Sequence, residues 1–252
     1  MKLCRRLVFT LFAWPLALAA GTADTLVQQA LAAEAHFDAK TALGLYLKAD
    51  AARPDDPFIL EKISRQYCDS MIDTASTDEK TRRAEKAVAY AKRAVALKPN
   101  SAVNLTSLAV SYGRLSLHCS STRTRIAYSR LVKDYAERAL ALDPDYDWAY
   151  HVLGRWNYEV ASLDATERFF ARLAYGGLPT ASTAEAVRLL RHAVMLAPKV
   201  PAHHVELGFA YLADRQPGPA RAEFEQGIRL PLREKYDIEE KARAKTALEN
   251  LR

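Results

Sequence analysis

A phrase that occurs four times is the feature that most constrains the fold: an alanine-rich amphipathic stretch that ends at a proline. An alanine precedes the proline by five residues each time, in the pairs Ala49 and Pro54, Ala94 and Pro99, Ala139 and Pro144, and Ala193 and Pro198. Proline cannot continue a helix, and it disfavours helical conformation in the residue before it. Each phrase therefore predicts the C-terminal end of a helix that presents one small residue to a neighbouring helix.

Residues 201–234 resemble the tetratricopeptide repeat, a helix–turn–helix unit of about 34 residues. The matching positions are Leu207, Gly208 and Tyr211 in the first helix and Ala220 and Phe224 in the second. Small residues are needed where the two helices cross closely, and the aromatic side chains fill the space between units. This segment is therefore predicted to be one complete repeat.

Four further repeats are expected at 23–56, 57–101, 102–146 and 147–200. The first of them is uninterrupted, with Ala42 and Tyr46 in register. In the second and third, the second helix begins about eleven residues later than a simple repeat would place it. The fourth carries Leu153 and Gly154 and then an insertion of about twenty residues before its second helix and Ala193. Such insertions are expected to project as loops, because each repeat of a stack contacts only its neighbours.

These observations predict an all-α protein with a single domain over 21–252. The expected architecture is a right-handed α-solenoid of about five tetratricopeptide-like repeats. A charged final helix over 237–251, with an apolar side that includes Ala247 and Leu248, is expected to cap the stack. Half of the residues are hydrophobic, which excludes a disordered or collagen-like chain.

The first twenty residues predict a secretory signal peptide. Lys2, Arg5 and Arg6 precede an apolar run over 7–20 that ends in small residues and is too short to span a bilayer comfortably. Export, most simply to a periplasm, is the expected localisation, and an uncleaved anchor or an organelle presequence is the alternative. Removal of 1–20 would halve the net charge of +6, and no later segment is a basic stripe, so a nucleic-acid partner is not expected.

A more specific resemblance rests on the order of the motifs along the chain. The stretches 87–99, 151–158, 168–174 and 178–182 are similar to the regulator of microtubule dynamics family, over about 57–250. The resemblance implies an α-solenoid that binds other macromolecules. Eukaryotic members are associated with microtubules, and one branch is associated with membrane contact sites and phospholipid binding. An exported protein would meet no tubulin, so the signal peptide argues against a microtubule role here.

The sequence favours a binding scaffold without chemistry. It contains no nucleophile elbow, phosphate loop, His-Glu-x-x-His or dinucleotide fingerprint, so neither catalysis nor a cofactor is expected. The helix positions that face the groove of such a stack give these binding candidates: Arg65, Val110, Trp148, His151, Arg155, Tyr158, Phe209 and Leu212. Aromatic rings and two arginines can hold another protein or an extended peptide. A lipid or small amphiphile in the same groove is the alternative, and membrane contact stays open.

The insertion over 160–182 offers a competing interpretation of the groove. Its Phe169, Phe170 and Leu173 could fold back and fill the groove. Trp148, Tyr158 and Phe209 would then be core residues rather than a binding surface.

Three smaller features leave alternatives open. Cys68 and Cys119 could form a disulfide in an oxidising compartment, or could stay free. The histidines at 118, 203 and 204 lack the ligand spacing of a closed metal site, so no metal is expected. The arginines at 82–83 and 123–125, in the two shorter insertions, are either a contact surface for an anionic partner or solvated loop charges.

Overall fold

The structure is a computed structural model that describes residues 14–164, 166 and 176–251, with side chains from Gly21 onward. All regular elements of this part of the chain are helices. In chain order they are α1 (Trp14–Ala35), α2 (Ala39–Ala52), α3 (Pro57–Asp69), the short 3₁₀ helix η1 (Ser70–Asp73), α4 (Thr77–Leu97), α5 (Ala102–Ser116), α6 (Thr122–Leu142), α7 (Asp147–Ala161), α9 (Thr183–Leu196), α10 (Pro201–Ala213), α11 (Pro217–Arg229) and α12 (Tyr236–Asn250).

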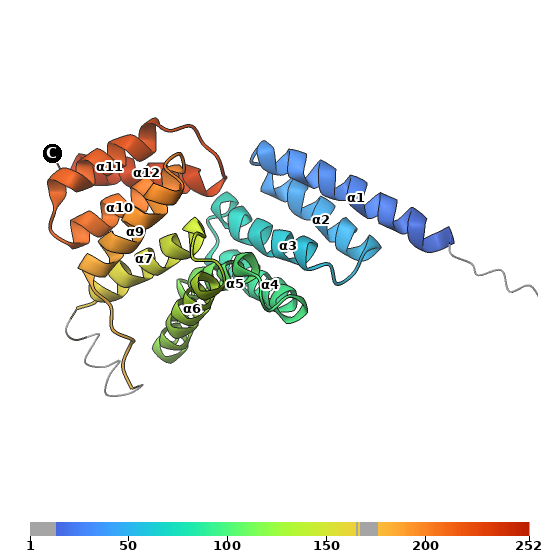
Figure 1. Cartoon of the computed structure of the whole chain (residues 1–252), viewed down its shortest axis with the longest axis horizontal. Coiled ribbons are helices and arrows are strands. Elements are labelled where there is room, and N and C mark those ends of the chain that lie inside the picture. The colour runs from blue at the N-terminus through green and yellow to red at the C-terminus, as the bar shows by residue number, and fades with distance from the viewer. Residues whose placement is uncertain (1–13, 165, 167–175, 252) are drawn as a thin grey trace, which may run out of the picture.

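The helices follow one another as hairpins that stack from the N-terminal to the C-terminal end (Figure 1). The pairs are α1 with α2, α3 with α4, α5 with α6, α7 with α9, and α10 with α11, and α12 packs on the last pair. The predicted all-α class and the stack of tetratricopeptide-like repeats are confirmed. The first helices α3, α5, α7 and α10 also contact one another in sequence, which places them on a common inner face.

Helix ends follow directly from local sequence. Arg53, Lys98, Asp143 and Ala197 are C-caps, and each stands immediately before one of the four prolines. Most starts carry a serine or aspartate whose side chain accepts a hydrogen bond from a backbone N–H of the first turn, as Ser101 does from Asn104 at 3.3 Å. Local chemistry therefore sets where the repeats bend.

The alanines expected at helix crossings are fully buried, namely Ala42, Ala94, Ala139, Ala193 and Ala220. Two glycines allow still closer contact. A Cβ at Gly154 would lie 2.4 Å from Cγ of Leu190, and one at Gly208 would lie 2.5 Å from the ring of Phe224. Tyr46 and Leu207 are buried, and Leu153 lies in the core with an exposed fraction of 5%. Tyr211 is partly buried at the edge of the last core clusters.

The two shorter insertions were expected to be loops, and this is wrong. The second helices of these repeats, α4 and α6, are each 21 residues long, against 14 for α2. Ser76 and Ser121 cap the two long helices, so most of the added chain extends each helix at its N-terminal end. Arg82, Arg83 and the arginines at 123 and 125 are consequently helical rather than loop residues.

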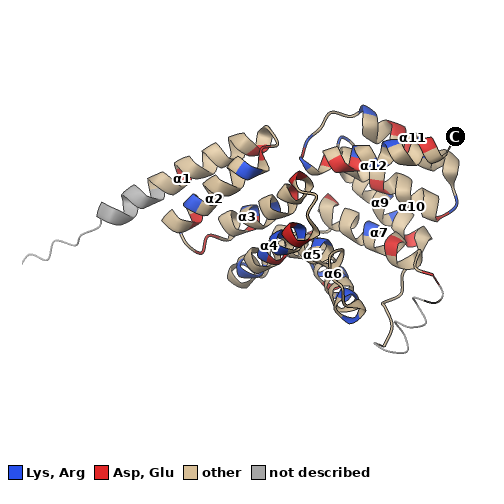
Figure 2. Cartoon of the chain, turned by 180° about the vertical axis from the view of Figure 1, so that it is seen from behind, with Lys and Arg blue, Asp and Glu red and all other residues tan. Residues whose placement is uncertain are grey.

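The predicted signal peptide lies mostly outside the described residues, which begin at Trp14. Helix α1 runs without a break through Ala20, so the expected cleavage position falls inside a continuous helix. Among the residues described, no helix is both long enough and apolar enough to cross a membrane. Most of the described helices carry both basic and acidic side chains (Figure 2).

Candidate functional site

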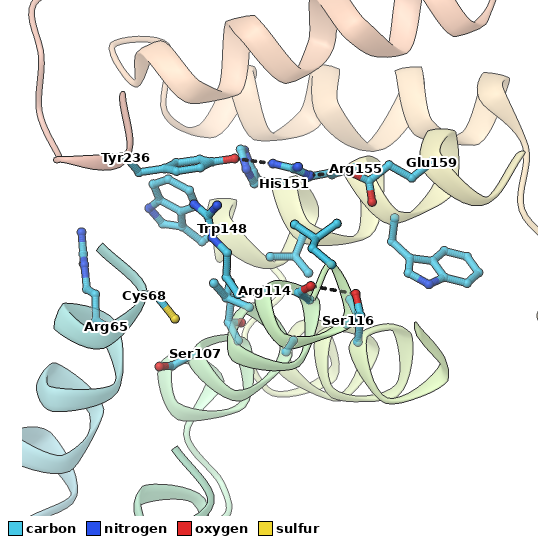
Figure 3. A pocket seen from close by; sticks show the side chains of 18 of the residues that line it. Arg65, Cys68, Ser107, Arg114, Ser116, Trp148, His151, Arg155, Glu159 and Tyr236 are labelled. Atoms are coloured by element: carbon cyan, nitrogen blue, oxygen red, sulfur yellow. Dashed lines mark hydrogen bonds and ion pairs between the residues drawn. The ribbon is translucent and has the colours of Figure 1, made fainter. Parts of the chain in front are cut away.

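The inner face of the stack contains a cavity of about 220 Å³ between α3, α5 and α7 (Figure 3). Five of the eight predicted groove residues line it: Arg65, Val110, Trp148, His151 and Arg155. They converge because successive first helices present the same face at equivalent positions. The prediction that these residues share one surface therefore agrees with the geometry, whereas their role in binding stays a prediction.

The walls of the cavity are apolar and its rim is charged. Val110, Val152 and Trp156 contribute apolar side chains to the lining, and Arg65 and Arg114 contribute guanidinium groups. Asp69 and Glu61 line the same cavity. Burial raises the pKa of Glu61, and it raises that of Asp69 to about 6 against the attraction of Arg65. The site thus combines apolar area with guanidinium groups that can bind an anion.

A segment that the sequence did not place at the groove closes one side of it. We call residues 231–239 the C-terminal strap; they link α11 to α12 and include the first turn of α12. In Figure 1 the strap reaches from the last repeat toward the end of α3. Glu234 and Tyr236 line the cavity. Sequence patterns indicate this segment only as the approach to a capping helix.

Four contacts join the strap to three earlier repeats. The Arg65 Nη2 and Glu234 Oε2 atoms lie 2.7 Å apart, and the Arg114 Nη1 and Glu239 Oε2 atoms 3.1 Å apart. Arg155 Nη1 donates to the Tyr236 hydroxyl at 2.5 Å, as Figure 3 shows. Lys235 Nζ lies 2.6 Å from Asp73 Oδ2 in η1. The strap therefore ties the C-terminal end of the stack to repeats two, three and four.

The shape of the strap is set by Asp237. Its Oδ2 accepts hydrogen bonds from the backbone N–H groups of Arg233 and Glu234, at 2.8 and 3.0 Å, and the residue is fully buried. The Tyr236 ring lies 6.5 Å from the Trp148 ring, and the guanidinium carbon of Arg114 lies 5.0 Å from the Tyr236 centroid. A backbone turn and an aromatic cluster thus fix the same short segment.

Below the strap lies a buried cluster of charges. Glu206 and Glu240 are fully buried, and both accept hydrogen bonds from Arg243 Nη1 at 2.7 Å. Arg155 Nη1 is 3.0 Å from Glu206, and the Tyr158 hydroxyl donates to Glu206. Burial opposes ionisation of Glu206, but the two arginines outweigh it and lower the pKa. Burial and the neighbouring Glu206 carboxylate raise the pKa of Glu240.

A histidine pair continues the polar core next to Trp148. His151 Nδ1 and His203 Nδ1 are 3.0 Å apart, and His203 Nε2 is 2.9 Å from Asp147 Oδ2. Burial, followed by the neighbouring His203, lowers the pKa of His151 well below its usual value, so its ring is neutral. A consistent assignment has His203 donating to Asp147 and His151 Nδ1–H donating to His203. The pair orients the wall of the cavity.

Three predicted groove residues lie away from the cavity. Tyr158 is buried, and its hydroxyl is used by Glu206. Phe209 and Leu212 face a separate apolar hollow of about 760 Å³, beside Ile72 and Ile238. The prediction of one continuous groove is therefore wrong in its C-terminal part, because α12 packs on α10 and separates the two surfaces.

The insertion does not supply the wall of the cavity in the residues described. Residues 165 and 167–175, including Phe169, Phe170 and Leu173, lie outside them. At its described end, the Gly177 carbonyl accepts a hydrogen bond from Arg130 of α6, and Ala181 packs beside the core. Among the described residues, the Trp148 ring lies 4.8 and 4.9 Å from the rings of His151 and His203, and 6.5 Å from that of Tyr236 in the strap.

Cys68 and Cys119 are free thiols in the structure, so the disulfide considered above is not formed. The Sγ atom of Cys68 lies 3.8 Å from Ser111 Oγ within the core of the first repeats, and Cys119 packs against a different core cluster. Separate packing keeps the two sulfur atoms apart. Within the described segments, no group of three His, Cys, Asp or Glu side chains is arranged to hold a metal ion.

Comparison with known proteins shows which family this architecture belongs to. The family model described as regulator of microtubule dynamics protein 1-3 matches residues 22–252. The chain belongs to the regulator of microtubule dynamics family. No curated protein matches this family member in sequence. The expected family resemblance is confirmed, and it extends further toward the N-terminus than 57–250.

Solved structures show the same fold at low identity. A thermophilic tetratricopeptide repeat protein of Thermus thermophilus has a TM-score of 0.66 and 17% identity, over 90% of this chain and 98% of that one. PilW, a widely conserved type IV pilus biogenesis factor, has a TM-score of 0.54 and 17% identity, over 90% and 86%. MamA from Desulfovibrio magneticus has a TM-score of 0.51 and 15% identity, over 86% and 96%. At these identities the likeness concerns the fold alone.

Proposed function

We propose that this family member is a non-catalytic scaffold that binds an extended segment of another protein at the cavity between α3, α5 and α7. The observation that carries the proposal is the combination of apolar walls with guanidinium groups from three successive repeats. Apolar side chains of a peptide fit the walls, and its polar groups meet the arginines at the rim. Export to a periplasm belongs to the same proposal and rests on the basic and apolar pattern of residues 1–20.

The size of the cavity favours a peptide over a whole lipid. Small-molecule pockets usually enclose about 300 to 1,000 Å³, and this cavity encloses about 220 Å³. One or two side chains fit such a volume, whereas two acyl chains do not. Binding of a single-chain anionic amphiphile is the second candidate, favoured by valines and tryptophans beside arginines. Native mass spectrometry of the purified protein tests it, and an absence of co-purifying lipid counts against it.

Affinity capture tests the scaffold directly. The bait is the full chain, compared with a Val110→Lys variant that places a charge in the cavity. Met195→Lys is the matched control, because Met195 is 65% exposed and lies away from the cavity. A partner captured by the wild type and the control but lost with Val110→Lys supports the proposal. Capture that is equal for all three baits contradicts the proposed site.

A further inference from the structure

We infer that the C-terminal strap is an internal copy of the ligand, and that the cavity recognises an acidic peptide with the pattern Glu-x-Tyr-x-x-Glu. The inference rests on the proposed function and names the class of partner. The pattern is that of Glu234, Tyr236 and Glu239 in the strap itself. The strap occupies the positions at which such a peptide would bind, so a partner must displace it.

Each strap group already makes the contact that a ligand would make. Glu234 meets Arg65 of α3 and Glu239 meets Arg114 of α5. The Tyr236 hydroxyl meets Arg155 of α7, and its ring faces Trp148. Three guanidinium groups from three repeats therefore bind two carboxylates and one phenol at a fixed spacing. Glu61, Asp69 and Glu159 also line the cavity, so the positions of Arg65, Arg114 and Arg155, and not a net positive charge, select carboxylates at this spacing.

A second observation indicates that the strap leaves a polar group of the cavity without a hydrogen-bond partner. Thr106 lines the cavity, is 3% exposed, and its Oγ1 has no hydrogen-bond partner among the described residues. A buried hydroxyl normally finds a partner. A peptide that entered more deeply than the strap could supply one through a backbone carbonyl or amide. The cavity thus accepts more ligand than the strap provides.

The two outer carboxylates of the strap are held weakly, whereas Tyr236 and Asp237 hold its middle. The side chains of Glu234 and Glu239 are 25% and 40% exposed, and ion pairs at such positions contribute little. Glu240, one residue after the strap, is fully buried against Arg243. Displacement therefore breaks the outer ion pairs, the Lys235–Asp73 pair, the Tyr236 contacts and the turn that Asp237 closes, while the rest of α12 remains packed on α10 and α11.

Equilibrium binding of a peptide to the full chain tests the inference. The probe is a fluorescein-labelled peptide with the sequence of residues 231–239, measured by anisotropy, and its matched control peptide has glutamine at both outer glutamates. The double variant Glu234→Gln/Glu239→Gln frees Arg65 and Arg114, so we expect it to bind the probe up to about tenfold more tightly than wild type. Glu185→Gln, which removes an exposed ion pair on α9, should leave the affinity unchanged.

Substitution of the arginines is expected to change the affinity for the probe peptide in the opposite direction. Arg65→Gln combined with Arg114→Gln should weaken binding at least about tenfold, and circular dichroism establishes that this variant is folded. Equal affinity of the double glutamate variant and Glu185→Gln, or equal binding of the glutamine peptide, would overturn the inference. If the acidic peptide fails while a Val110-dependent partner is still captured, the scaffold stands and the acidic pattern is wrong. If both fail, the proposed function fails with it.

Discussion

Helices α2 and α10 occupy opposite ends of the stack and are buried by different chemistry. The buried residues of α2 are three alanines and Tyr46. Helix α10 buries Ala202, Val205 and Leu207, but also His203, His204 and Glu206. The first end needs only matching shape. The second end needs polar partners, which α7, α11 and α12 provide, so its stability depends on contacts with other helices.

The comparison teaches that the same repeat can be used for packing or for closure. Buried alanines and glycines let the two helices of a hairpin pack closely where they cross. Ion pairs appear where the strap and α12 return to the inner face and join repeats that are not neighbours in sequence, and those of Glu206 are buried. A buried ion pair adds little stability by itself, whereas breaking one is costly because a charge remains unpaired.

Removal of a buried carboxylate gives the largest expected effect. Glu206→Gln keeps the shape but leaves Arg155 and Arg243 with one buried carboxylate, Glu240, between them. We expect a loss of about 3 to 5 kcal/mol in the free energy of unfolding, measured with urea. The control is Glu159→Gln, an exposed partner of the same Arg155, with a loss below about 1 kcal/mol. Equal losses would show that the C-terminal end is no more charge-dependent than the surface.

The second largest expected effect comes from adding a methyl group where α10 and α11 pack most closely. Gly208→Ala places a methyl carbon 2.5 Å from the Phe224 ring, so the ring or the helix must move. We expect a loss of about 1 to 3 kcal/mol from overpacking. Gly44→Ala is the matched control in α2, where no atom lies within 4 Å of the added carbon; it should gain about 0.5 to 1 kcal/mol. Equal changes in the free energy of unfolding for the two variants would show that a glycine at a helix crossing and a glycine on the surface are equivalent.

A third prediction concerns pH and His204. Both ring nitrogens face acceptors, Glu223 Oε2 at 2.7 Å and the Pro198 carbonyl at 2.9 Å. Burial opposes the charged ring, but these hydrogen bonds outweigh it and raise the pKa of His204. A raised folded pKa stabilises the protein fully below the unfolded value near 6.5, and that contribution is lost as the pH rises through the folded value.

His204→Gln removes this dependence. At pH 5.5 the variant should be less stable than wild type by roughly 1.5 to 3 kcal/mol, the usual scale for a hydrogen bond to a charged group. The difference should shrink toward pH 9, as measured by urea unfolding at each pH. A difference that grows with pH would contradict the assignment of a charged ring. His36, an exposed histidine in the turn after α1, supplies the matched control through His36→Gln.

The smallest expected effect is a difference in thiol reactivity. Burial raises the pKa of Cys68 to about 11 and also raises that of Cys119, but Cys119 is only partly buried and so more accessible. At pH 8, a maleimide should label Cys119 readily and Cys68 only after denaturation, as mass-spectrometric peptide mapping can measure. Absence of labelling at both positions without reductant, and its appearance with reductant, would indicate the disulfide that the structure lacks.

Much of the fold could be predicted from the residues alone. Four proline phrases located four helix ends, and the alanine and aromatic positions located the hairpins, because both signals are local. The two shorter insertions were assigned incorrectly as loops, since a serine cap and helix-forming residues extended α4 and α6 instead. Five of eight groove residues came together because the repeat geometry fixes which face of each first helix turns inward.

The remaining part of the site depended on distant contacts. Helix α12 was expected to cap the stack, and periodicity predicted it correctly. Nothing local indicates that the preceding strap crosses to Arg65, Arg114 and Arg155, because those contacts join residues more than eighty positions apart. The sequence by itself determined the pairing of the helices and four of their C-terminal ends, through short-range propensity and repeated small residues. Only the tertiary structure decided where the charges pair, because ion pairs depend on distance in space and not on spacing along the chain.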